Sequence, residues 1–207
     1  MQNLVIGRLL RSNTSGCVFG CRVSQISTPQ LGELIRISID QNQDKEWVYG
    51  LINDIHIDDD GLIRQLVSTE GISEEVLLDN RENRNMPVEI SVLFTGCKLN
   101  SEILYLLPPR PPLSLDKVHL CNSEELIEFT NSGHYGYFRH ILRDSNLPSG
   151  EILAAHLRQA GKAHSSEIGG DPQWIQGAIQ ELITLMKHDH NSLMSILGAV
   201  ADAHLSI

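Results

Sequence analysis

The tripeptide His188-Asp189-His190 is the first place where this sequence could hold a metal ion. Imidazole and carboxylate groups are ligands that Zn²⁺ accepts, but no cysteine or glutamate stands at a recognised zinc spacing from it. The tripeptide also separates two helical patterns, where capping residues are expected. Glu124 and Glu125 could act as paired acids, yet they stand at a predicted helix start, where the helix dipole favours negative charge. We expect no metal ion and no catalytic residue at either place.

Cys17 and Cys21 form a CxxxC pair, which could suggest redox or metal chemistry. On an extended strand the two residues would lie about 13 Å apart, at ~3.3 Å per residue, which is too far for a disulfide. We therefore favour two small residues buried on one strand face. The nine histidines form no HExxH motif, the chain has no GxSxG motif, and no Cys/His pair carries a family signature. The sequence thus contains no recognised catalytic signature.

Gly161-Lys162 is the only Gly-Lys pair in the second half of the chain, and it could belong to a nucleotide-binding loop. Such a loop needs glycines beside the phosphates, a lysine, and a Ser or Thr hydroxyl that binds Mg²⁺. Here Ala163 stands in place of the hydroxyl residue, and His156 stands in place of the leading glycine. No Walker A motif is present, so we expect no bound nucleotide and no other cofactor.

The charge of the chain argues against direct contact with nucleic acid. The 207 residues carry a formal net charge of −10, and no basic run supplies the phosphate contacts that carry much of the affinity for DNA or RNA. Tyr135, Tyr137 and Phe138 could stack on bases, but with only Arg139 and Arg143 nearby we expect them in a core or an interface. No secretory leader and no apolar run of about 18 residues is found, so we expect a reduced cytoplasmic protein without a membrane span.

Residues 32–55 predict the central structural element. Two runs of alternating apolar residues flank a polar turn at 40–46, which predicts an antiparallel hairpin. Gly50 lies inside the second run, as a bulge or barrel-corner glycine would. Trp47 and Tyr49 in the same run are candidates for contacts with a partner or for the core. Further short strands are predicted at residues 3–10, 16–25, 62–69, 87–97 and 103–107. The strand at 103–107 is the last of this set, and the even spacing of about six short strands predicts a small six-stranded β-barrel.

The second half of the chain changes to helical periodicity. Residues 108–112, PPRPP, predict a stiff extended connector, with a PxxP ligand as the alternative. Asn122 is predicted to begin a helix over 124–129, with Glu125 completing a capping box. Residues 134–142 fit either a strand or a helix. Three more helix starts are predicted, at Ser149 (with an end near Gly161), at Asp171-Pro172, and at Asn191.

The predicted fold class is therefore α+β, mainly β with a helical C-terminal part. A small six-stranded barrel is followed by about three to four helices. The expected parts are a barrel over 1–110, a proline-rich connector with a short helix over 111–147, and a helical region over 148–207. The apolar stripes of the last helices are too wide to remain in water, so these helices should pack as a compact cap.

Several segments resemble the HAS barrel, the β-barrel shared by HerA-type DNA translocases and the ring subunits of ATP synthase. They are IGRLL near the start, FGCRV, the paired strands LGELIRIS and VYGLINDI, the strand PVEISVLFTGC, and the segment LPPRPPLSLDKVHLCNSEELIEF. In HerA-like proteins a RecA-like ATPase domain follows, whereas the rest of this chain is short and lacks the phosphate loop. The resemblance implies a HAS-type barrel without its motor.

Two hypotheses about function follow. In the first, the chain is a non-catalytic assembly or protein-interaction module that associates with itself or docks on a partner, such as a HerA-like ATPase or a nuclease. In the second, it is an enzyme or nucleic-acid-processing factor whose site forms only in three dimensions. We favour the first, because no segment carries a catalytic pattern and the acidic surface offers no nucleic-acid signal.

Overall fold

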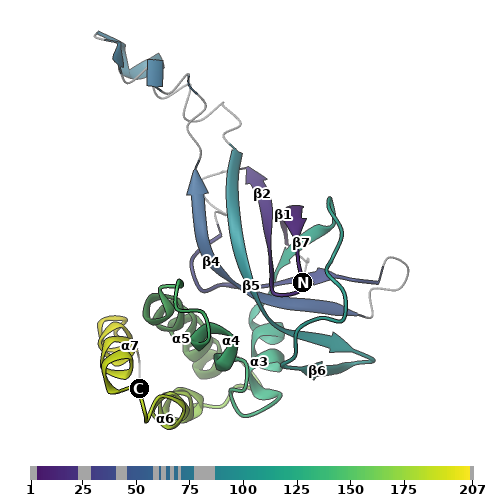
Figure 1. The fold of residues 1–207 in the computed structure, drawn as a ribbon, viewed down its shortest axis with the longest axis vertical. Coiled ribbons are helices and arrows are strands. Elements are labelled where there is room, and N and C mark those ends of the chain that lie inside the picture. Colours follow the sequence, from purple (N-terminus) through teal and green to yellow (C-terminus); the bar gives the residue numbers. More distant parts are fainter. Residues whose placement is uncertain are drawn as a thin grey trace.

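In the computed structural model, a β-barrel carries a layer of helices against one side of its wall (Figure 1). The structure describes residues 4–22, 29–40, 46–57, 61, 64, 65, 68, 69, 71–76 and 87–205. The described residues form seven strands, β1–β7, and after them the five helices α3–α7. This architecture confirms the predicted fold class.

Six antiparallel strands close the barrel, and a seventh extends it at one edge. The strands are β1 (Val5–Ser12), β2 (Gly16–Arg22), β3 (Leu34–Ser38), β4 (Trp47–Ile57), β5 (Pro87–Leu99), β6 (Glu102–Leu104) and β7 (Lys117–Leu120). The pairing order is β2-β1-β7-β3-β4-β5-β6, and a further β2–β5 pairing closes the ring. Closure satisfies the backbone hydrogen bonds that an open sheet would leave at its two edges.

The barrel interior is filled by every second side chain of its strands, as alternation predicts. Phe19, Ile37, Ile52 and Phe94 belong to this inner core and are fully or almost fully buried. Gly50 points inward as well, and an added Cβ would lie 2.5 Å from Val92 Cγ1. The register between β4 and β5 shifts beside Gly50, so the predicted bulge is confirmed.

The ring needs a strand that the sequence did not predict. Residues 103–107 contribute only β6, which pairs with the end of β5 outside the ring. The ring is closed by β7, which lies between β1 and β3. The strand expected at 62–69 is also wrong where the structure describes it, because Arg64, Gln65 and Ser68 are helical. Residues 41–45 of the polar turn predicted in the central hairpin lie outside the described residues.

The helices are α3 (Ser123–Asn131), α4 (Phe138–Leu142), α5 (Ser149–Ser166), α6 (Trp174–Leu185) and α7 (His190–Asp202). The segment that fitted a strand or a helix is α4, which is one helix more than the predicted number. Helix α5 continues past Gly161, where an end was predicted. Gly161 faces α6, where an added Cβ would lie 3.2 Å from Ile175 Cδ1, a tight contact.

Two predicted helix starts are displaced by two residues or fewer. Asp171 accepts a hydrogen bond from Gln173 N (2.9 Å), but α6 itself begins only at Trp174. At α7 the capping side chain is Asp189 rather than Asn191, and it accepts from Ser192 N at 3.1 Å. Asp171 therefore holds the residue before α6, whereas Asp189 accepts from one of the backbone N–H groups that the start of α7 exposes.

The helical layer packs on the outer wall of the barrel, as the sequence predicted. A second core joins Leu34, Tyr49 and Leu51 of the barrel wall to side chains of α3–α7. Tyr137 and Phe138 are fully buried in this core, as expected for the aromatic group, and the hydroxyl of the half-buried Tyr135 donates to Trp174 O at 2.9 Å. The C-terminal helices therefore form a compact cap and not a detached tail.

Candidate functional site

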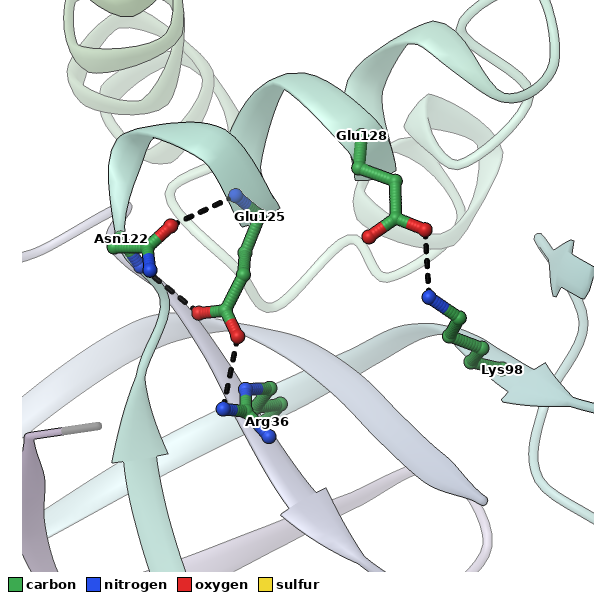
Figure 2. A network of polar contacts seen from close by, with 5 residues as sticks. All are labelled: Arg36, Lys98, Asn122, Glu125 and Glu128. Carbon is green, nitrogen blue, oxygen red and sulfur yellow. Dashed lines mark hydrogen bonds and ion pairs between the residues drawn. The ribbon is translucent and has the colours of Figure 1, made fainter. Parts of the chain in front are cut away.

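A buried ion pair joins the barrel to the first helix of the cap. Asn122 Oδ1 accepts from Glu125 N (2.9 Å), and Glu125 Oε2 accepts from Asn122 N (3.0 Å), which completes the predicted capping box. The other oxygen of Glu125 lies 2.8 Å from Arg36 Nη2 on β3. Figure 2 shows this network beside the more exposed pair of Lys98 and Glu128, whose atoms are 2.6 Å apart. Glu125 therefore caps its helix and holds it to the barrel.

The same junction accounts for both aromatic residues of the central hairpin. The guanidinium carbon of Arg36 lies 3.9 Å from the ring centroid of Trp47, a cation–π contact. Trp47 also meets His119 edge-on, with ring centroids 5.8 Å apart. Tyr49 is buried beside Phe129, at a centroid distance of 5.0 Å. Of the two alternatives, the core position is therefore correct for Tyr49, whereas Trp47 is half-buried and packs against the edge of the same core.

Buried histidines in the cap are candidates for acid–base chemistry, but their hydrogen bonds give them a structural role. Gly32 O can only accept, so His156 Nδ1 donates to it at 3.1 Å, and His156 Nε2 then accepts from the Tyr137 hydroxyl at 2.9 Å. Burial lowers the pKa of His156 to about 4. The ring is thus held neutral, with both nitrogens occupied by protein partners.

His164 is held in the same way. Its Nδ1 accepts from Asp171 N at 3.0 Å, so its Nε2 carries the proton and donates to Thr130 Oγ1 at 2.8 Å. The ring stacks on Trp174 with a centroid distance of 4.7 Å. Burial lowers the pKa of His164. These histidines connect elements of the cap and leave no nitrogen for a substrate or a metal ion.

The residues that the sequence singled out for metal or redox chemistry are not brought together. No group of three or more His, Cys, Asp or Glu side chains suited to a metal ion occurs among the residues that the structure describes. Asp189 is occupied as a helix cap, and the hydrogen bonds from Ser192 lower its pKa. Cys17 and Cys21 are unpaired and buried on one face of β2, as predicted, and burial raises the pKa of Cys17 to about 12.

Gly161-Lys162 forms no phosphate loop, because both residues lie inside α5. They border a pocket of about 370 Å³ whose charged or titratable lining residues are Arg158, Lys162 and His204. Helical backbone N–H groups are engaged within the helix and cannot cradle a phosphate.

Within the described ranges, no helix is both long enough and apolar enough to cross a bilayer.

Exposed leucines are concentrated in two neighbouring parts of the described chain. Thirteen large apolar side chains are exposed in the described residues. Seven of them belong to β1 with its preceding residue and to residues 105–116, which we call the proline segment: Leu4, Val5, Leu10, Leu106, Leu107, Leu113 and Leu115. The segment runs from β6 to β7 along one side of the barrel (Figure 1). Concentration of this kind marks an interaction site more often than scattered apolar residues do.

The centre of this surface is held rigidly against β1. Leu115 N donates to Leu9 O (2.8 Å), and Ser114 Oγ donates to Leu10 O (3.1 Å). Arg8 Nη1 donates to Leu115 O at 2.9 Å. We call Leu10, Leu113 and Leu115 the leucine face; their exposed fractions are 45%, 57% and 68%.

Leu115 adopts a backbone conformation that does not suit leucine. Its φ is +73°, in the left-handed region, which costs a residue with a Cβ roughly 1–2 kcal/mol. The side chain gains little burial in return, since it is the most exposed of the three leucines. Glycine or asparagine would serve the isolated molecule better at this position. The backbone strain at Leu115 therefore coincides with the exposure of its apolar side chain to solvent.

The proline segment is fixed to the barrel and is not an open PxxP ligand. Arg110 Nη2 donates to Ile39 O at 2.9 Å, and Ser12 Oγ donates to Pro112 O at 2.6 Å. Pro108 and Pro112 are buried. The prolines thus shape the turn that presents the leucines. This surface was not predicted from the sequence. The segment PPLSL carried a usable signal, because its leucines stand in a stretch that contains too many prolines to form a helix.

No protein-family model and no curated protein matches this chain. The function must therefore be argued from the geometry above and from the sequence.

Proposed function

We propose that this protein is a non-catalytic interaction module that binds another protein chain, a partner or a second copy, through its leucine face. The observation that carries the proposal is the strained and exposed Leu115. Exposed apolar side chains held by ordered backbone are ready to be buried by a partner without further loss of chain entropy. The polar groups that could have suggested an enzyme, such as Glu125 and His156, are instead engaged inside the protein.

The resemblance to the HAS barrel supports the same proposal. If the chain is a HerA-like barrel without its motor, a HerA-type ATPase or an associated nuclease is a reasonable partner. The four cysteines are free, as in the reducing cytoplasm, where we place the protein.

Binding of ATP is expected to be absent. Gly161-Lys162 lies within a helix, and Ala163 follows where a magnesium-binding hydroxyl would be needed. Isothermal titration with ATP and Mg²⁺ should give no heat of binding. A micromolar dissociation constant would overturn the motorless proposal.

Replacing Leu115 with asparagine separates stability from binding. Asparagine tolerates the left-handed conformation, so the free energy of unfolding should stay unchanged or rise by up to about 1 kcal/mol. Loss of an apolar anchor should weaken association about tenfold or more. Urea unfolding measures the first effect. The second is measured by light scattering and by quantitative affinity purification from native extract with wild-type and Leu115→Asn baits.

Met194→Asn is the matched control, because Met194 on α7 is 54% exposed and lies outside the leucine face. This variant should retain every partner of the wild-type protein. The proposal fails if Leu115→Asn retains them too, or if the wild-type protein is monomeric and enriches no partner.

A further inference from the structure

Two cations lie directly opposite each other beside the leucine face. Arg8 on β1 is the register partner of Lys117 on β7. Both side chains are exposed, and neither forms an ion pair with a carboxylate of the described residues. Like charges directly opposite on neighbouring strands are destabilising. The hydrogen bond from Arg8 to Leu115 O (2.9 Å) does not relieve this repulsion, because a carbonyl oxygen carries no net charge.

Charged groups elsewhere on β1 and in the proline segment are engaged within the protein. Asp116 Oδ2 accepts from Leu113 N at 2.7 Å and so closes the turn. Arg11 pairs with Glu89 at 2.9 Å. Arg110 lies 3.8 Å from Glu46, the two atoms being Nη2 and Oε2. Counting Asp116 against Arg8 and Lys117 still leaves a net positive charge next to the exposed leucines.

Resting on the proposed function, we infer that the leucine face binds an acidic amphipathic segment of another protein. Apolar side chains of that segment would cover Leu10, Leu113 and Leu115, and its carboxylates would face Arg8 and Lys117. The guanidinium of Arg8 already donates to Leu115 O, so it is positioned at the edge of the apolar surface. Carboxylates there would remove the repulsion between the two cations and would speed association by electrostatic steering.

Selection from a displayed library of random peptides tests this inference. The full-length wild-type protein is the target, and clones that also bind Leu115→Asn are discarded. The retained peptides should combine apolar anchors with an excess of Asp and Glu. The best of them, made synthetically, should bind Arg8→Glu/Lys117→Glu about tenfold or more weakly, and binding to the wild-type protein should weaken as salt is raised.

The matched control is Arg158→Glu/Lys162→Glu, which reverses two exposed cations on α5 and changes the net charge equally. It should leave peptide binding unchanged. Neutral or basic peptides that still require Leu115, or acidic peptides that bind Arg8→Glu/Lys117→Glu normally, would overturn the inference and leave the proposed function standing. If selection yields no peptide that requires Leu115, the inference is rejected together with a peptide-binding role for the leucine face.

Discussion

Replacing Glu125 with glutamine is expected to lower the free energy of unfolding by about 2 to 4 kcal/mol. Glutamine keeps an acceptor for Asn122 N but removes the charge that faces Arg36. The Arg36 side chain is 6% exposed, so its positive charge would remain buried without this carboxylate. Urea unfolding monitored by circular dichroism measures the change.

Glu128→Gln is the control on the same helix. Glu128 pairs with Lys98 at 2.6 Å, but its side chain is 51% exposed against 22% for Glu125. Exposed pairs contribute little, so the expected loss is about 0.5 kcal/mol. The double variant Arg36→Met/Glu125→Gln should recover part of the loss, because it removes the buried cation together with the carboxylate. Equal losses for Glu125→Gln and Glu128→Gln would show that the junction does not depend on the buried pair.

Stability should fall steeply in mild acid because His156 is buried as a neutral ring. Its pKa is about 4 in the folded protein and about 6.5 in the unfolded chain. Between these values the unfolded chain binds the additional proton, so this contribution is complete above about pH 6.5 and is lost as the pH falls toward 4. The difference in pKa corresponds to about 3 kcal/mol.

The measurement compares urea unfolding of the wild-type protein and His156→Gln between neutral pH and mild acid. Glutamine cannot take up the proton, although it loses some packing against Tyr137 and Gly32. The wild-type advantage at neutral pH should therefore shrink by about 3 kcal/mol as the pH falls. His140, whose pKa is also lowered by burial, and Glu33, whose pKa is raised, are present in both proteins and enter both pH profiles. Burial lowers the pKa of His164 too, and His164 interacts electrostatically with His156, so part of the measured difference belongs to this pair. A difference that does not change with pH would contradict the role assigned to His156.

Local patterns in the sequence determined most of the barrel. Successive side chains of a strand lie on opposite faces, whatever packs against those faces. Phe94 could therefore be assigned to a core before the residues that contact it were known. Gly50 was recognisable because a glycine inside an apolar run indicates a close approach or a bulge. The capping box of Asn122 and Glu125 needs only a spacing of three residues, and it formed as predicted.

Tertiary structure alone decided how the barrel closes and what its surface offers. The four residues of β7 carry too short a pattern to be read as a strand, and their role depends on β1 and β3, more than 75 residues earlier in the chain. Gly161 lies inside α5 and close to Ile175 of α6, and this packing cannot be read from the local sequence. Arg36 meets Glu125 only because α3 lies on β3. Whether a leucine is buried or displayed depends on the whole packing around it, so the exposed and strained Leu115 could not be found in the sequence.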